Sequence, residues 1–168
     1  MTNFAYVGLG SNLGHPRRRL ARALTELARL PRSELVAASR NYRTAPLGAA
    51  EPQPDYINAV AALRTALGPG AMLRHLRAIE HRHGRRQLGE RRNAPRVLDL
   101  DLLLFGRRRL ALTRLTVPHP RMHERAFVLR PLLDIAPAAT IPGRGAARRW
   151  LHRVRNQRIV RTRTAFWR

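Results

Sequence analysis

The chain has 168 residues, 44% of them hydrophobic, so it can bury one core and falls within the usual size of a single domain. It carries 33 basic and 10 acidic residues, a formal net charge of +23, and every Lys or Arg position is Arg. Because lysine is absent, P-loop enzymes and protein kinases, whose ATP sites use a lysine, are excluded. Because cysteine is absent, disulfides, thiolate metal sites and thiol nucleophiles are also excluded.

The excess of arginine has two explanations between which the sequence does not decide. A genome bias that replaces Lys by Arg would produce it without functional meaning, whereas a polyanionic partner such as nucleic acid would make it functional. No basic segment followed by an apolar run stands at the start, and no stretch approaches the ~18 apolar residues that cross a bilayer. We therefore expect a cytoplasmic protein that does not contact a membrane; a monomer is our expectation for its oligomeric state.

Hydrophobic spacing along the chain predicts strands and helices in alternation. Short apolar runs between turn signals predict strands at residues 4–9, 35–42, 56–64 and 97–105. Apolar residues at helical spacing predict helices at residues 16–30, 68–84 and 127–135, with a short last helix around 150–154. This order indicates an α+β fold of the ferredoxin-like class, a mostly antiparallel sheet with helices packed on one of its faces.

The segment before the last predicted strand is strongly basic. Residues 84–96 contain five arginines opposed only by Glu90, a composition that forms no core and predicts a loop. The planar fork of arginine binds phosphate oxygens in pairs, so this loop could close over a triphosphate. We expect residues 84–95 to be mobile without ligand, because this loop is polar, its charges repel one another and it must open to admit substrate.

Two aspartates interrupt the most apolar strand of the chain. Because side chains alternate across a strand, Asp99 and Asp101 share one face while the leucines at 98, 100 and 102 point to the other and into the core. Two carboxylates about 7 Å apart along a strand repel each other unless a cation neutralises them. Mg²⁺ prefers one or two carboxylates together with phosphate oxygens and water, so it suits such a pair. The alternative is a solvated pair on an edge strand, bonded to some of the many arginines.

Five separated motifs carry a family resemblance. They are YVGLGSNLG at residues 6–14, YRTAPL at 42–47, RVLDLDLLLFG at 96–106, VPHPR at 117–121 and FVLRPL at 127–132. In this order they resemble the 6-hydroxymethyl-7,8-dihydropterin pyrophosphokinase family, over the chain up to about residue 137. The resemblance implies one catalytic domain, 1–168, with an Arg-rich C-terminal segment, 144–168. It also implies transfer of pyrophosphate from ATP to the pterin alcohol with release of AMP, in tetrahydrofolate biosynthesis, with two Mg²⁺ ions.

The same resemblance implies roles for individual residues. The metal would be held by Asp99 and Asp101, and the catalytic set would add the arginines Arg85, Arg92 and Arg96. The residues implied to bind the pterin are Thr44, Leu47, Tyr56, Asn58 and Phe127. The residues implied to bind the nucleotide are Arg77, Glu80, Leu102, Arg114, Thr116, His119 and Arg125.

Two alternatives to this enzyme stay open. One is a basic nucleic-acid-binding module derived from the same fold, which would bind DNA or RNA tightly and with a steep salt dependence. The other keeps the fold and the pterin pocket but has an altered activity, because Gln87 and Ala94 stand where the family usually has Arg and Gly.

Overall fold

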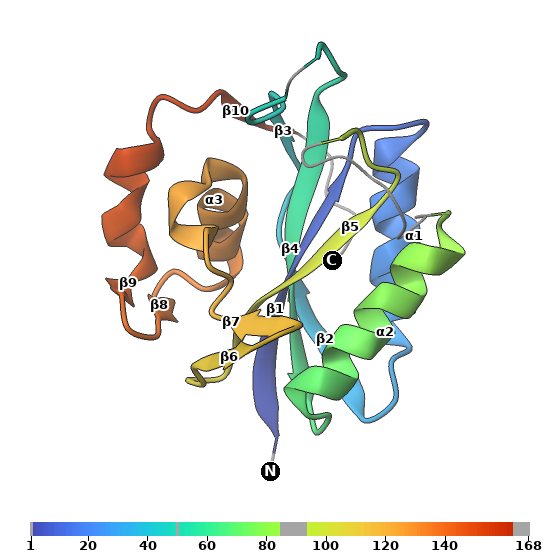
Figure 1. Ribbon diagram of the computed structural model, residues 1–168, viewed down its shortest axis with the longest axis vertical. Helices are drawn as coiled ribbons and strands as arrows, with labels where there is room; N and C mark the ends of the chain where they lie inside the picture. The colour runs from blue at the N-terminus through green and yellow to red at the C-terminus, as the bar shows by residue number, and fades with distance from the viewer. Residues whose placement is uncertain (1, 50, 85–93, 163–168) are drawn as a thin grey trace.

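The computed structural model describes residues 2–49, 51–84 and 94–162 (Figure 1). The helices are α1 Pro16–Ala28, α2 Pro69–Arg82 and α3 Ala126–Ile135, with the 3-10 helices η1 Met122–Glu124 and η2 Ala147–Val154. The strands are β1 Asn3–Ser11, β2 Ser33–Ala38, β3 Tyr42–Thr44, β4 Tyr56–Thr65, β5 Asp99–Phe105, β6 Leu110–Leu112, β7 Leu115–Val117, β8 Thr140–Ile141, β9 Gly145–Ala146 and β10 Ile159–Arg161.

A six-stranded sheet forms the centre of the molecule, and its strand pairs are antiparallel. Its order is β10-β3-β4-β1-β5, with β2 pairing a different part of β4 from β3. The long strands β1 and β4 pair from Asn3↔Thr65 to Ser11↔Ile57. The α+β class and the mostly antiparallel sheet predicted from the sequence are confirmed.

Helices cover both faces of the sheet, not one face as we expected from the sequence. The helices α1 and α2 pack on one face, while α3 and η2 pack on the other (Figure 1). The physical reason lies in β4 and β5, which are buried on both sides; Val60 and Leu103, for example, pack against α3. A strand buried on both faces reads as a near-continuous apolar run, and each of its faces then needs a cover.

The stretch 35–42, expected to be one strand, forms two. It breaks after β2, where Ser39 turns the chain: its N–H donates to Val60 O at 2.8 Å and its Oγ accepts from Val60 N at 2.9 Å. The chain then re-enters the sheet as β3, beside the other end of β4. This break places Thr44 opposite Tyr56, at the end of the sheet where the candidate site lies.

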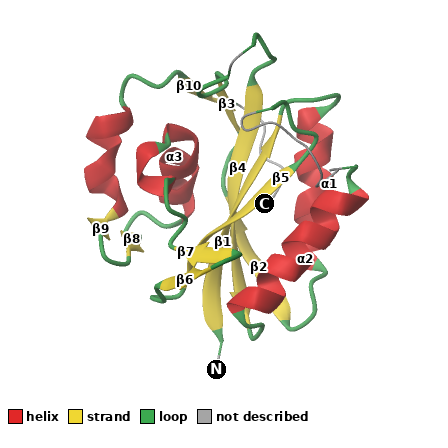
Figure 2. Cartoon of the chain, viewed as in Figure 1, coloured by secondary structure: helices red, strands yellow, loops and turns green. Residues whose placement is uncertain are grey.

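The arginine-rich end of the chain is part of the fold up to residue 162. As predicted, a short helix forms around Trp150 and Val154; it is η2, and it packs against α3 (Figure 2). The chain then adds β10 to the outer edge of β3. Within the described residues, no helix is both long and apolar enough to cross a bilayer.

Candidate active site

The two aspartates of β5 share one face of the strand, as the alternation of side chains predicts. Leu98, Leu100 and Leu102 are at most 4% exposed and belong to the core under α1 and α2. Asp99 and Asp101 point the opposite way, with side chains that are 24% and 36% exposed. The core leucines therefore fix the direction of both carboxylates.

A cavity of about 340 Å³, here called the sheet cavity, lies over β1, β4 and β5 on the side of α3. Its floor includes Gly8 and Gly10 of β1, and its walls come from the loop after β3 and from the first turn of α3. Both aspartates line it. The five residues implied to bind pterin also line it, and these are Thr44, Leu47, Tyr56, Asn58 and Phe127.

Hydrogen bonds and close packing fix one wall of the sheet cavity. Asn58 is 4% exposed and donates through Nδ2 to Thr44 Oγ1 at 2.8 Å. Its Oδ1 lies against Gly10, where a Cβ would come within 2.9 Å of that oxygen. On the same strand, Tyr56 donates its hydroxyl to Ala94 O at 3.3 Å, and burial raises the pKa of that hydroxyl. These contacts position the wall, which offers amide and aromatic groups to a ligand.

A second cavity of about 800 Å³, here called the hairpin cavity, lies between α2, β5 and the β6–β7 hairpin. Five of the seven residues implied to bind nucleotide line it, namely Arg77, Glu80, Arg114, Thr116 and His119. The buried Glu80 accepts a 2.7 Å hydrogen bond from Leu100 N. Because β5 is an edge strand of the sheet, this bond gives α2 a direct hold on the strand that carries the two aspartates.

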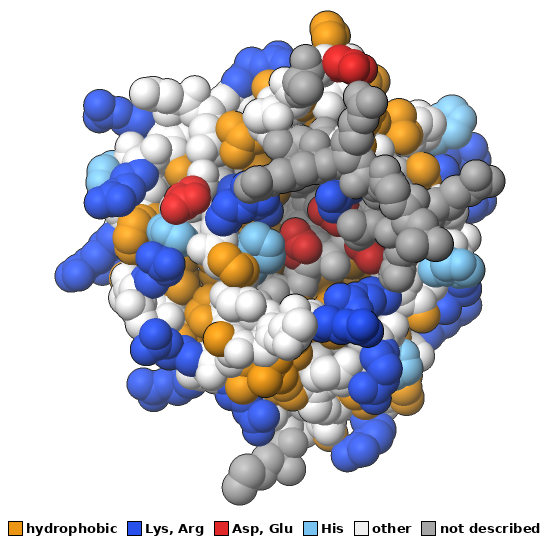
Figure 3. Space-filling view, in the orientation of Figure 1, with side chains coloured by type: hydrophobic (Ala, Val, Ile, Leu, Met, Phe, Trp, Pro, Cys, Tyr) orange, Lys and Arg blue, Asp and Glu red, His pale blue; other side chains and the backbone are white. Residues whose placement is uncertain are grey.

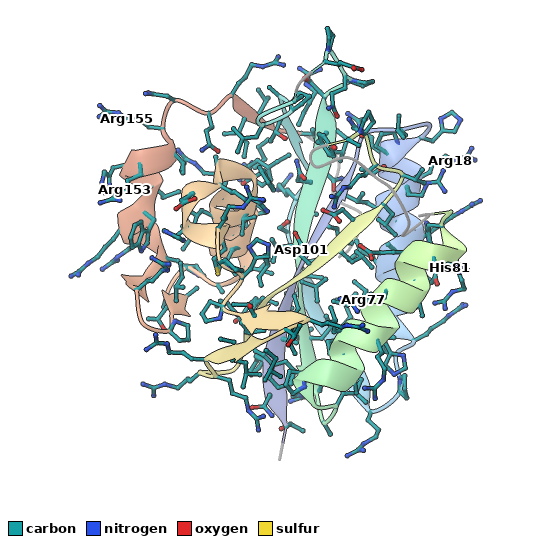
Figure 4. The ribbon with its side chains drawn as sticks, viewed as in Figure 1. Arg18, Arg77, His81, Asp101, Arg153 and Arg155 are labelled. Carbon is teal, nitrogen blue, oxygen red and sulfur yellow. The ribbon has the colours of Figure 1, made fainter. Side chains whose placement is uncertain are left out.

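The two cavities meet at Arg96, Asp101 and His119, which line both of them. Figure 3 shows acidic side chains near the middle of this face with basic side chains around them, and Figure 4 shows Asp101 there on β5. Arg96 Nη1 donates a 2.6 Å hydrogen bond to Asp99 Oδ1. Burial alone would lower the pKa of Arg96, but the neighbouring Asp99 raises it above its ordinary value. This junction therefore holds carboxylates and arginines at close range.

His119 is a neutral hydrogen-bond donor in this junction. Burial, and then the charges of Arg125 and Arg121, lower its pKa to about 4. Its Nδ1 accepts the backbone N–H of Arg121 at 3.2 Å, so we assign the ring proton to Nε2. That nitrogen lies 3.7 Å from Asp101 Oδ2. The imidazole thus presents an N–H group, not a lone pair, to the point where the cavities join.

Some of the implied site residues lie elsewhere. The Leu102 side chain is packed in the core under α1 and α2, so only its backbone could face a nucleotide. Arg125 lines the sheet cavity, with its guanidinium 3.9 Å from Asp101 Oδ2. Arg85 and Arg92 lie outside the described residues, as does most of the basic loop that we expect to be mobile.

Asn12 is a residue that the sequence reasoning did not single out. It is 3% exposed and joins three segments: its Oδ1 accepts from Arg96 N at 2.8 Å, and its Nδ2 donates to Gln53 Oε1 and Pro54 O at 3.0 and 3.1 Å. Through these bonds the end of β1 binds both the backbone N–H of Arg96 and the loop that leads to Tyr56. The sequence offered only an asparagine after a glycine-rich strand end, which does not indicate its partners.

Comparisons with known proteins agree in one family. A family model described as 7,8-dihydro-6-hydroxymethylpterin-pyrophosphokinase matches residues 6–137. The chain is 50% identical over 142 residues to the 2-amino-4-hydroxy-6-hydroxymethyldihydropteridine pyrophosphokinase of Pseudomonas aeruginosa, covering 84% of this chain and 86% of the relative. It is 45% identical over 138 residues to the enzyme of that name from Haemophilus influenzae, covering 82% and 84%.

Solved structures of longer proteins have the same fold. A crystal structure of a Plasmodium falciparum HPPK-DHPS triple mutant matches 93% of this chain with a TM-score of 0.71 at 15% identity, and the chain spans 44% of that protein. At this identity the likeness shows the fold alone. Fold, family model and relatives are in agreement, and the chain belongs to the 7,8-dihydro-6-hydroxymethylpterin-pyrophosphokinase family.

Proposed function

We propose that this chain is a 2-amino-4-hydroxy-6-hydroxymethyldihydropteridine pyrophosphokinase. It transfers pyrophosphate from ATP to 6-hydroxymethyl-7,8-dihydropterin and releases AMP, a step of tetrahydrofolate biosynthesis. The observation that carries the proposal is the junction at Arg96, Asp101 and His119, where the sheet cavity, lined by both aspartates, meets the hairpin cavity, which is lined by Asp101. The names of the family and of its relatives support the same activity.

The sheet cavity is suited to the pterin. Its volume is that of a site for a small flat ring system, and Tyr56 and Phe127 can stack on the two faces of the ring. Asn58 offers an amide to the edge of the ring, and Gly10 leaves that amide room. A pterin held there would direct its hydroxymethyl group toward the two aspartates.

The hairpin cavity is suited to ATP. Arg77 and Arg114 line it beside the acidic Glu80, and Arg96 and His119 stand where it opens onto the sheet cavity. Arginine forks and the Nε2–H of a neutral imidazole are donors to phosphate oxygens. The triphosphate would therefore reach the junction from this side while the pterin reaches it from the other.

The reaction that this arrangement serves is an in-line displacement. The hydroxymethyl oxygen of the pterin attacks the β-phosphorus of ATP, and a new O–P bond forms. The bond between the β-phosphorus and the oxygen that bridges it to the α-phosphorus breaks, AMP leaves with that oxygen, and the hydroxyl proton is released. Positioning and charge neutralisation dominate catalysis of such transfers, and Arg96 and Arg125 are the described cations nearest the carboxylates.

The carboxylate pair fits Mg²⁺, the metal that the resemblance implies. Asp99 and Asp101 are hard oxygen donors on one face of one strand, partly exposed, and both line the sheet cavity. Within the described part of the chain they belong to no group of three or more acidic or histidine side chains suited to a metal, so phosphate oxygens and water would complete the coordination. Bound Mg²⁺ supplies charge neutralisation at the phosphates and activation of the alcohol.

Two ions, a monomer, a cytoplasmic location and a single domain 1–168 stay predictions.

The test is incubation of the protein with ATP, Mg²⁺ and the reduced pterin, followed by measurement of nucleotide products. We expect AMP, and release of ADP instead would contradict the proposal. Asp99→Asn should lower the rate by orders of magnitude, whereas Glu34→Gln, which removes an exposed acid on β2, should leave it unchanged.

The same pair of variants tests the rival function of a basic nucleic-acid-binding module. Such a protein would release no AMP. It would bind DNA or RNA with a steep salt dependence, and Asp99→Asn would leave that binding equal or slightly stronger.

A further inference from the structure

Gln157, which lies beyond the residues matched by the family model, bridges two backbone groups at the start of α3. Its Oε1 accepts the N–H of Ala126 at 2.8 Å, and its Nε2 donates to Glu124 O at 2.8 Å. Gln157 lies between η2 and β10, and its backbone N–H donates to Val154 O at 3.0 Å. One amide thus ties the C-terminal segment to the chain just before and just inside the helix.

This contact replaces a cap that α3 lacks. The residue at the N-cap position is Arg125, whose side chain has no acceptor and makes no capping hydrogen bond. The first N–H groups of a helix have no partner inside the helix, so they need one from outside. Gln157 supplies it from a segment 31 residues further along the chain.

The capped turn is also a wall of the sheet cavity. Ala126 is flanked by Arg125 and Phe127, both of which line the cavity, and the guanidinium of Arg125 lies 5.4 Å from the centre of the Phe127 ring. The bridge at Ala126 therefore fixes the backbone from which both side chains project.

The strand that follows Gln157 pairs with another lining segment of the sheet cavity. In β10, Ile159 pairs with Thr44 of β3, the residue whose hydroxyl accepts the hydrogen bond from Asn58. One residue beyond β10, Thr162 N donates to Asn41 O at 2.8 Å. The segment 157–162 thus contacts the backbone of two segments that line the cavity, the first turn of α3 and β3.

We propose that Gln157 is a positioning residue for the pterin, acting through the first turn of α3. Gln157 lines neither cavity, so we expect it to contact neither substrate. This inference rests on the proposed function, because it concerns how tightly the sheet cavity holds the pterin ring. Loss of the bridge should loosen Phe127 and weaken pterin binding more than ATP binding, since Arg125 and Phe127, which flank the bridged Ala126, line the sheet cavity and not the hairpin cavity.

The experiment compares Gln157→Ala and Gln157→Glu with the wild-type chain. The loss of a helix cap corresponds to roughly a fivefold change in an equilibrium, so Gln157→Ala should raise KM and Kd for the pterin by about that factor and KM for ATP by less than about twofold. Gln157→Glu keeps an acceptor for Ala126 N–H but loses the donor to Glu124 O. Its pterin KM and Kd should therefore lie between those of the wild type and those of Gln157→Ala. The control is Asn156→Ala, since Asn156 is exposed and adjacent in sequence.

The outcomes separate this inference from the proposed function. An unchanged pterin KM in Gln157→Ala, or equal increases in both KM values together with a lower Tm, would overturn the positioning role. If Gln157→Ala does not fold, Gln157→Glu is used instead, and a wild-type pterin KM in that variant would contradict the positioning role. A wild-type protein that binds the fluorescent pterin but forms no AMP contradicts the proposed function, and the effect of Gln157→Ala on pterin Kd then still decides this inference.

Discussion

Arg96 Nη1 lies 2.6 Å from Asp99 Oδ1, and the backbone of the same arginine is held by Asn12, so this ion pair is fixed where the two cavities meet. Both side chains are only about one-quarter exposed. A cation bound to Asp99 would compete with this guanidinium for the same oxygen. We therefore expect Arg96 to increase the rate by binding the triphosphate and to weaken metal binding by pairing with Asp99.

Replacing Arg96 separates these two effects. Arg96→Ala should lower kcat/KM by about 10²-fold, the usual result of removing one preorganised donor to a developing charge. The same change should reduce the Mg²⁺ concentration needed for half-maximal rate, because Asp99 loses its competing partner. Steady-state kinetics with varied ATP and Mg²⁺ measure both. Arg64→Ala, which removes an arginine paired with the exposed Glu34, is the control, and a Mg²⁺ requirement that rises in Arg96→Ala would contradict the competition.

Gly10 provides a test of the pterin wall. In Gly10→Ala the new Cβ would lie 2.9 Å from Asn58 Oδ1, closer than real Cβ contacts, so the buried amide that donates to Thr44 must shift. We expect pterin affinity to fall by roughly tenfold or more, the change that 1.4 kcal/mol produces. Titration of the pterin fluorescence measures it. Gly70→Ala is the matched control, since the nearest atom to its Cβ is 4.0 Å away; equal affinities in both variants would show that Asn58 does not read the pterin.

Much of this site could be predicted because strand alternation and short motifs determine it locally. The direction of Asp99 and Asp101 follows from the core leucines that alternate with them, and Tyr56 and Asn58 share a face for the same reason. That alternation also places the Leu102 side chain in the core, opposite to the cavity. The contact between Leu102 and a nucleotide that the resemblance implies remains a prediction, and only the backbone of Leu102 could make it.

Other features depend on contacts between distant segments, which a single sequence does not reveal. The packing of α3 and η2 on the second face depends on β4 and β5 being buried on both sides. The bridges made by Asn12 and Gln157 join residues 84 and 31 positions apart, and polar side chains at those positions have no periodic pattern. Arginine composition likewise says nothing of which guanidinium meets a carboxylate.

Glu80 allows a structural role to be separated from a role in nucleotide binding. Glu80→Ala leaves the buried Leu100 N–H without this acceptor, which should destabilise the fold by about 1–3 kcal/mol in urea unfolding. Glu80→Gln keeps an acceptor for that N–H and removes the charge. If the carboxylate contacts the nucleotide, Glu80→Gln should raise KM for ATP while retaining most of the stability. A Gln variant with wild-type KM would assign Glu80 to support of β5 alone.

His119 gives the folded state a pH dependence with a definite sign. Burial, followed by the charges of Arg125 and Arg121, lowers its pKa to about 4, whereas the unfolded chain has the ordinary value of 6.5. Between these values the unfolded state binds a proton that the folded state does not bind. Stability is therefore unaffected by this group above pH 6.5 and falls as the pH decreases from 6.5 to 4, by at most about 1.4 kcal/mol per pH unit.

A comparison with His119→Gln isolates this contribution from the carboxylates that titrate in the same range. Between pH 7 and pH 4.5, the wild-type free energy of unfolding should fall by about 2 kcal/mol more than that of His119→Gln, which has no group to protonate. Urea unfolding at the two pH values measures the difference. Equal losses in both proteins would mean that the ring takes up its proton in the folded state. In that case His119 would carry a positive charge beside Asp101 at pH 4.5, instead of the neutral Nε2–H that the structure assigns to it.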